Sequence, residues 1–214
     1  MTVNGVSIEP STYVKYLGLL LDEFLRFNYH IDNVCAKVAP KIGILKKLKS
    51  FIPSDILLVI YYAFIHPHFN YIVGVWGSAS VRLLNAPQVL QNRALKHVYK
   101  LPFRFSTNEL YFEKYHVPNL KCLYYFNICN FVYNVINDYS YHTIQFPKFN
   151  HSFMTRNKDC LILPKVRTTV GQRSISFIGP LYFNNLPIEI VNCNNHASFK
   201  KQLKKYLREN LRPP

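Results

Sequence analysis

The sequence predicts a mainly α-helical protein in which a short β-hairpin precedes a helical bundle, a loop-rich segment and a basic C-terminal helix. Hydrophobic residues recur at steps of three and four after the first thirty or so residues, which is the spacing of one helix face. The turn dipeptide Asn4-Gly5, flanked by apolar residues, indicates a hairpin before that point. These patterns divide the chain into residues 1–29 (hairpin), 30–138 (helices), 139–190 (loop-rich) and 191–214 (basic helix).

The composition favours a folded, anion-binding protein. The chain has 214 residues, of which 49% are hydrophobic and 15% aromatic, so it is not a disordered tail. Lysine and arginine outnumber aspartate and glutamate by 26 to 11, which gives a formal net charge of +15. A surplus of that size needs an anionic partner, with nucleic acid as the first candidate and an acidic membrane surface as the second.

Cysteine usage and the first residues predict a cytoplasmic or nuclear protein that is not secreted. The 5 cysteines are odd in number and irregularly spaced, which favours reduced thiols. The segment Met1–Gly5 has neither the basic nor the apolar part of a signal peptide.

One uncharged stretch between Asp55 and Arg82 raises the question of a membrane span. Its apolar core is interrupted by His66-Pro67-His68 and Asn70, and polar groups in the middle of a span are costly in lipid. We therefore expect a buried core helix and no membrane partner, while a membrane-associated protein that uses residues 56–76 stays as an alternative.

The N-terminal segment is expected to form a hairpin from Val3 to Leu21, with one strand running from Tyr13 to Leu21. A glycine within that strand, Gly18, suggests a bulge or the close approach of another backbone. The following helix has its apolar face on Ile31, Val34, Val38, Ile42, Leu45 and Leu48. Pro40 lies inside this pattern and is expected to kink or break the helix.

Further helices are expected from capping residues and apolar spacing. One begins near Ser54 as its N-cap and, being apolar nearly all round, should be the central buried element. The others are expected over Leu83–Lys100, with Gln91 on its polar side, over Asn108–Tyr115, and over Leu120–Asn137 with Asn119 as N-cap.

Several segments resemble one known family. The stretch from Val14 to Asp22, followed by His30-Ile31, resembles the K-Y-L-G-hydrophobic-x-hydrophobic-D…H-I segment of reverse transcriptases of non-LTR retrotransposons of the LINE and jockey-like type. Similar matches are Gln91-Asn92-Arg93-Ala94-Leu95, His151 with Thr155-Arg156, Pro164 with Arg167-Thr168, Ser176-Phe177 with Gly179-Pro180 and Phe183-Asn184, and Ser198 to Leu207. Phe183 stands where many members of that family have tryptophan.

The resemblance implies a primer grip, a thumb-like helical bundle and the C-terminal tail of such an enzyme. Tyr16, Leu17 and Gly18 would be the primer-grip residues. Polymerase chemistry uses paired carboxylates that hold metal ions on a palm, and this sequence has no Asp-Asp pair. We therefore expect a catalytically incomplete C-terminal fragment that is not an enzyme on its own, with the family's Mg²⁺ held in a palm that this chain lacks.

The candidate nucleic-acid contacts are basic side chains, although any single lysine is more often simply solvated. RNA or DNA, as template–primer or element RNA, is the expected partner, and self-association through the N-terminal strand is a further expectation. The candidates are Lys37, Lys41, Lys46, Lys47, Lys49, Arg93, Lys96, Arg156, Arg167, Lys200, Lys201, Lys204 and Lys205.

No metal or cofactor is assigned to this sequence. His66-x-His68 and Cys193-x-x-His196 are half-sites without matching partners, and Cys122 and Cys129 read as core residues. An alternative function is a host-retained module that binds nucleic acid or another protein and has no role in retrotransposition.

Overall fold

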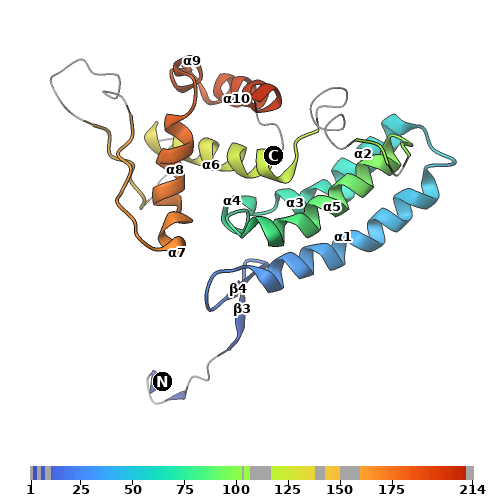
Figure 1. Ribbon diagram of the computed structural model, residues 1–214, viewed down its shortest axis with the longest axis horizontal. Coiled ribbons are helices and arrows are strands. Elements are labelled where there is room, and N and C mark those ends of the chain that lie inside the picture. Colours follow the sequence, from blue (N-terminus) through green and yellow to red (C-terminus); the bar gives the residue numbers. More distant parts are fainter. Residues whose placement is uncertain are drawn as a thin grey trace. The chain divides into compact units, whose positions relative to one another are not determined.

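The computed structural model describes residues 11–102, 104–106, 117–137, 143–149 and 160–210, and the backbone of residues 2–3 and 6–7 (Figure 1). The chain divides into two units, and each is described by itself. Unit 1 comprises Met1–Ile72 and Ala79–Pro102, and unit 2 comprises Val73–Ser78 and Phe103–Pro214. The elements confirm a mainly helical fold with an N-terminal hairpin.

The N-terminal part of unit 1 contains two short antiparallel hairpins. Strand β1 (Thr2–Val3) pairs with β2 (Val6–Ser7), while the predicted turn residues between them lie outside the described residues. Strand β3 (Tyr13–Tyr16) pairs with β4 (Leu19–Asp22). The single strand predicted from Tyr13 to Leu21 is therefore wrong, because the chain reverses within it.

The reversal is a two-residue turn at Leu17-Gly18, where φ is 46° and 81°. Positive φ at both central residues matches the twist of the paired strands, and glycine adopts it without steric cost. The close approach predicted at Gly18 is made by an aromatic side chain rather than a backbone. A Cβ on Gly18 would lie 3.4 Å from Cε1 of Tyr71, whose hydroxyl donates to the Leu17 carbonyl at 2.5 Å.

The turn after β4 is organised by Asp22. Its carboxylate accepts hydrogen bonds from the backbone amides of Phe24, Arg26 and Phe27 at 3.2, 2.9 and 2.6 Å. Phe27 has a φ of 63°, and helix α1 begins at the next residue. A carboxylate that accepts several backbone amides can hold such a turn in place, so Asp22 has a structural role.

Helix α1 (Asn28–Leu48) runs through Pro40 without ending, so of the predicted kink or break the break is wrong, while the kink stays a prediction. Proline leaves the carbonyl of Ala36 without its helical donor. Both Pro40 and Ala36 are exposed, so water can satisfy that carbonyl. The predicted apolar face is largely confirmed, since Ile31, Val34, Val38, Ile42 and Leu45 are buried.

The next helices of unit 1 are α2 (Ser54–Phe64), α3 (His66–Asn70) and α5 (Val81–Val98). Ser54 is the first helical residue of α2 rather than its N-cap, which is Pro53. The prediction that α2 is the central buried element is wrong: it buries Leu57 and Tyr61, whereas Val59 is 64% exposed. The main helix contact of unit 1 is α1 against α5, and α2 covers one side of α5.

Helix α5 carries a buried glutamine that the sequence pattern had placed on the polar side. Gln91 is fully buried, and its amide nitrogen donates to the Tyr61 hydroxyl at 3.1 Å. Its amide oxygen accepts from Gln88 at 3.1 Å. Tyr61 is itself buried, so the Gln91 amide satisfies a hydroxyl that the core would otherwise leave unpaired.

Unit 2 is built from α4 (Val73–Trp76), α6 (Leu120–Ile136), α7 (Thr169–Gln172), α8 (Ile175–Asn184), α9 (Ile188–Val191) and α10 (His196–Asn210). The predicted cap of α6 is confirmed, because the Asn119 side chain accepts from the amide of Cys122 at 2.8 Å. The helix predicted over Asn108–Tyr115 lies outside the described residues. The loop-rich segment predicted over residues 139–190 is helical from Thr169 on, as α7, α8 and α9.

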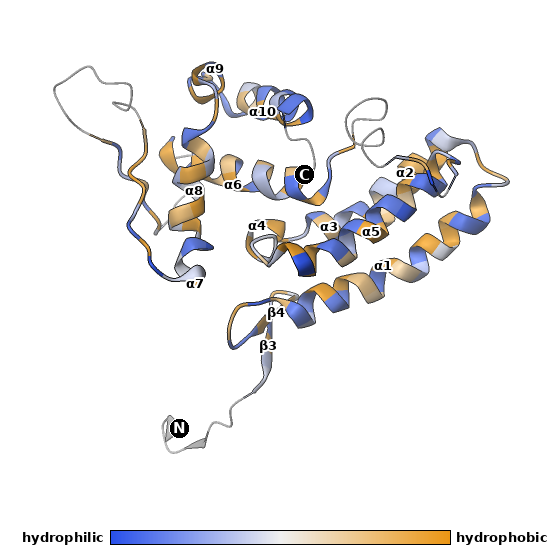
Figure 2. Ribbon diagram, in the orientation of Figure 1, coloured by the Kyte–Doolittle hydropathy of each residue, from blue (hydrophilic) through white to orange (hydrophobic). Residues whose placement is uncertain are grey.

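The core of unit 2 is aromatic. Tyr133 of α6 stacks on Phe199 of α10 with ring centroids 3.9 Å apart, and its hydroxyl donates to the Cys193 carbonyl at 2.7 Å. Helix α8 packs closely on α6 because Gly179 has no side chain: a Cβ there would lie 2.9 Å from Val132. Figure 2 shows α8 largely apolar and α10 largely hydrophilic, and α10 buries Phe199, Leu203 and Leu207 along one face.

Within the described residues, none of the helices combines the length and apolar character needed to cross a membrane.

Candidate nucleic-acid interface

The lysines predicted on α1 differ in their surroundings. Lys37, Lys46 and Lys47 are exposed, whereas Lys41 and Lys49 are half-buried. None of these lysines lies on the apolar face of α1 that packs on α5, so none of them is fully buried.

Lys41 is engaged within unit 1. Its ammonium donates to the Phe64 carbonyl at 3.2 Å and contacts Nε2 of His68. The Phe64 carbonyl lies in the last turn of α2, where helix carbonyls lack intrahelical donors. Burial, followed by the charges of Lys41 and Lys37, lowers the pKa of His68. Lys41 therefore ties α1 to the end of α2, and its phosphate contact stays a prediction.

The basic ends of α1 and α5 lie close to each other. Burial, followed by the positive charges of Lys49 and Lys46, lowers the pKa of His97, which lies in the last turn of α5. We call Lys46, Lys47 and Lys49 of α1, together with Arg93, Lys96, His97 and Lys100 from α5 and its end, the unit 1 basic cluster.

Arg93, Lys96 and His97 recur at steps of three and four along α5, so these members of the cluster lie on one side of the helix. Arg93 is exposed and lies one turn before His97, so the two share a face. Lys96 is half-buried and Lys100 is exposed. The carbonyls at both helix ends attract these cations, which accounts for part of the clustering without any ligand.

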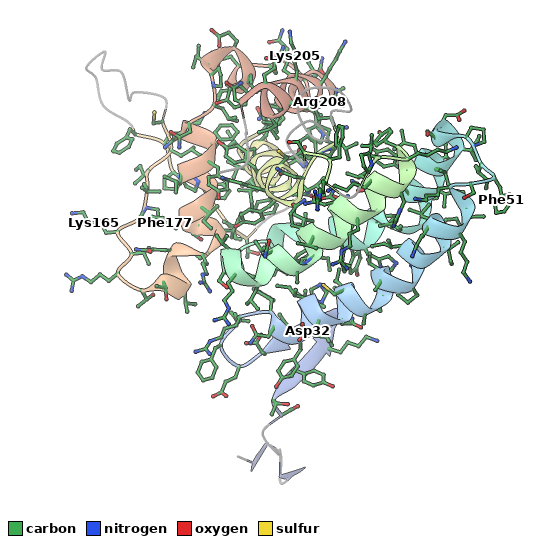
Figure 3. The ribbon with its side chains drawn as sticks, turned by 45° about the vertical axis from the view of Figure 1, so that its right-hand side comes forward. Asp32, Phe51, Lys165, Phe177, Lys205 and Arg208 are labelled. Carbon is green, nitrogen blue, oxygen red and sulfur yellow. The ribbon has the colours of Figure 1, made fainter. Side chains whose placement is uncertain are left out.

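Helix α10 of unit 2 presents a second set of cations. Phe199, Leu203 and Leu207 are buried on one face. The other face exposes Lys201, Lys204, Lys205 and Arg208, at the spacing of consecutive helical turns, while Lys200 is half-buried. Figure 3 shows Lys205 and Arg208 on α10. We call Lys200, Lys201, Lys204, Lys205 and Arg208 the α10 basic face.

One member of the α10 basic face also contacts an aromatic ring. The ammonium of Lys204 lies 5.5 Å from the ring centroid of Phe126 on α6. A cation over a ring face is attracted by the ring's electrons, so this lysine helps to hold α10 on α6.

The remaining basic candidates are less informative. Arg167 is exposed and precedes Thr168, whose hydroxyl accepts from the amide of Gly171 at 3.1 Å and caps α7. The Arg167-Thr168 pair therefore lies at a helix start, which is a structural role for at least the threonine. Arg156 lies outside the described residues.

The primer-grip-like residues lie at the end of β3 and in the turn that follows it. Tyr16 and Leu17 are 63% and 69% exposed at the tip of the β3–β4 hairpin, next to Gly18. Leu19, by contrast, is buried, whereas Tyr13 and Val14 of β3 are also exposed, at 44% and 58%.

The described histidines, cysteines and carboxylates do not assemble a metal site. No group of three or more of these residues that could hold an ion occurs within the described ranges. Burial raises the pKa of Cys122 to about 11, and burial raises the pKa of Cys129 well above its ordinary value. These thiols therefore stay protonated and pack as core residues, as the sequence predicted.

Other tail motifs also have structural roles. Asn184 accepts from the Leu161 amide and donates to the Leu161 carbonyl, both at 2.9 Å, in the way a neighbouring strand would. His97 was not among the residues predicted from the sequence, and the effect of Lys46 and Lys49 on it places the ends of α1 and α5 near each other. A histidine directly after Lys96 was the only signal for it in the sequence.

Three curated proteins are similar to part of this chain. The probable RNA-directed DNA polymerase from transposon BS of Drosophila melanogaster is 29% identical over 104 residues, which is 47% of the chain. The RNA-directed DNA polymerase from mobile element jockey is 27% identical in Drosophila funebris and 26% identical in Drosophila melanogaster, each over 113 residues or 51% of the chain.

The chain spans a small part of these relatives, 12% of the length of each. No family model matches the chain. No solved structure matches it significantly. The resemblance to the RNA-directed DNA polymerases of jockey-like, non-LTR retrotransposons is thereby confirmed over about half of the chain.

Proposed function

We propose that this chain is a nucleic-acid-binding part of a reverse transcriptase of the non-LTR retrotransposon type, and that it does not carry out polymerisation itself. Its ligands are the template–primer and the element RNA. The binding elements are the unit 1 basic cluster and the α10 basic face. Both hold their cations on ordered helices, so the charges are preorganised for phosphate rather than spread along a coil.

The observation that carries this proposal is the meeting of two basic segments about fifty residues apart in the sequence. Helix α1 packs along α5, and Lys46 and Lys49 act electrostatically on His97. Bringing cations together costs free energy unless an anion is bound or solvent screens them. Nucleic acid is the anion that the related polymerases act on, according to their names.

We infer from the carboxylates of this chain that it does not provide the pair of metal-binding groups that polymerisation uses. Nucleotidyl transfer uses paired metal ions held by acidic side chains. The sequence has no Asp-Asp pair, and the carboxylate of Asp22 accepts three backbone amides in a turn. We therefore assign neither a metal nor a cofactor to this stretch.

The binding proposal predicts a steep dependence on salt that the lysines of unit 1 control. We expect the logarithm of the affinity for an oligonucleotide to fall linearly with the logarithm of the salt concentration. Replacing Lys46, Lys47 and Lys49 by glutamine should make that slope shallower by roughly 2 to 3, since each neutralised phosphate contributes about 0.7–0.9. Fluorescence anisotropy at several salt concentrations measures both slopes.

The matched control is glutamine at Lys121, Lys148 and Lys165, three exposed lysines of unit 2 that belong to neither basic group. It removes the same charge and should leave the slope close to that of the wild type. Bound phosphate should also raise the pKa of His97, by offsetting the lysines that lower it, which NMR can follow. Equal slopes for the two triple variants would contradict the proposal.

The same proposal predicts that the chain does not extend a primer. A purified chain with a homopolymer template, a labelled primer and Mg²⁺ or Mn²⁺ should give no longer products than a heat-denatured sample. Extension by a preparation shown to be free of other polymerases would overturn this part of the proposal while leaving the binding part intact.

A further inference from the structure

An exposed aromatic ring lies at the turn between α1 and α2. Phe51 is 85% exposed, the highest value among the large hydrophobic side chains of the described residues. Figure 3 shows it at the tip of this turn. An exposed phenylalanine contributes no hydrophobic burial energy to folding. Packing in the core of unit 1 therefore does not explain why this residue is a phenylalanine.

The backbone around Phe51 is ordered. The amides of Phe51 and Ile52 both donate to the Leu48 carbonyl, at 2.9 and 3.0 Å. On the other side of the turn, the amide of Leu57 donates to the Pro53 carbonyl at 3.1 Å as α2 begins. Ile52 is half-buried and anchors the turn, so the neighbouring ring is held outward by a fixed backbone.

The surroundings of the ring are cationic. Lys46, Lys47 and Lys49 lie two to five residues before Phe51, and the packing of α1 on α5 adds the basic end of α5 to this end of unit 1. Asp55, in the first turn of α2, is the nearest acidic residue in the sequence. Phe51 therefore belongs to a positively charged tip.

An exposed aromatic face among cations matches the chemistry of unpaired nucleic acid. Bases stack on aromatic rings, and their phosphates bind nearby lysines and arginines. A closed duplex offers phosphates but hides its base faces in the stack. The combination at this tip therefore favours a strand with unpaired bases over a fully paired one.

We propose that Phe51 stacks on an unpaired base of the bound nucleic acid while the unit 1 basic cluster holds the neighbouring phosphates. This inference rests on the proposed nucleic-acid binding and adds to it the kind of strand that is bound. Phe51 thereby selects single-stranded segments, such as an overhang next to a duplex, over continuous duplex.

The test compares Phe51→Ala with the wild-type full chain on two probes. One probe is a single-stranded oligonucleotide that carries 2-aminopurine, and the other is a covalently closed circular duplex without ends. We expect Phe51→Ala to weaken binding of the oligonucleotide by roughly 5- to 150-fold, the range that corresponds to one base–aromatic stack. Binding of the closed duplex should change by less than about twofold, because a closed duplex exposes no base face.

Two further variants keep the result interpretable. Phe51→Tyr retains a stacking ring and should restore both the affinity and the quenching of 2-aminopurine. Phe64→Ala removes another exposed ring, 62% exposed at the far end of α2, and should behave as the wild type. Circular dichroism should be the same for all variants, since neither ring is part of the core.

The outcomes separate this inference from the proposed function. If Phe51→Ala weakened binding of both probes equally, or of neither, the stacking role of Phe51 would be overturned. The proposed function would stand, provided that binding still depended on salt. No binding of either probe by the wild type would overturn the proposed function as well. A third outcome is that the wild type binds acidic phospholipid vesicles, and that Phe51→Ala abolishes this binding but leaves oligonucleotide binding unchanged. This tip would then be a membrane contact, and the stacking role would be overturned.

Discussion

Replacing Phe199 by alanine should lower the free energy of unfolding of unit 2 by about 3–5 kcal/mol, the range for removing a buried aromatic ring. Phe199 is fully buried, and its ring stacks on Tyr133 at a centroid distance of 3.9 Å. The substitution removes the ring stack between α10 and α6 and leaves a cavity between them. Urea denaturation followed by circular dichroism measures the change.

The matched control is Phe149→Ala. Phe149 belongs to the same unit and is 42% exposed, so the loss should stay below about 1 kcal/mol, as for substitutions away from the core. A loss for Phe199→Ala no larger than that of the control would mean that α10 does not depend on this stack. The α10 basic face would then not be positioned as described.

The second large effect is expected at Tyr61 in unit 1. Tyr61 is fully buried between α2 and α5, and Tyr61→Ala should cost about 3–5 kcal/mol, because it removes one of the largest side chains of that core. Tyr61→Phe keeps the ring but removes the acceptor of the Gln91 amide. An unsatisfied buried donor costs about 1–3 kcal/mol, so phenylalanine should be the milder change.

Adding Gln91→Leu to Tyr61→Phe distinguishes packing from polar satisfaction. The double variant replaces both hydrogen-bonding partners by apolar groups, which can be nearly neutral, so it should recover part of the loss of Tyr61→Phe. Thermal and urea unfolding of the four forms give the coupling energy. If the loss of stability in the double variant equalled the sum of the losses in Tyr61→Phe and Gln91→Leu, the hydrogen bond between Tyr61 and Gln91 would not be a stabilising pair.

The candidate site could be predicted only in part. The individual lysines of α1 and α10 were found from the sequence, because runs of basic residues need no knowledge of the fold. Their engagement could not be predicted: Lys41 donates to the Phe64 carbonyl, and Lys204 lies over the ring of Phe126. Each partner is distant from its lysine in the sequence, so no local sequence pattern predicts these contacts.

What the sequence determined by itself is local. The apolar stripe of α1, the Asn119 cap of α6, the mainly helical fold and the resemblance to retrotransposon polymerases all follow from short motifs or from spacing within one element. Helix periodicity and capping act over a few residues, and a linear sequence contains that information completely.

What only the tertiary structure decided depends on contacts between distant residues. Tyr71 covers the Leu17-Gly18 turn, Gln91 is buried because Tyr61 offers it a hydroxyl, and α2 stays half-exposed although it is apolar nearly all round. Asn184, the last residue of α8, likewise hydrogen-bonds the backbone of Leu161, which lies outside that helix. Burial is a property of the neighbours that the whole fold supplies, so hydrophobic character alone could not assign it.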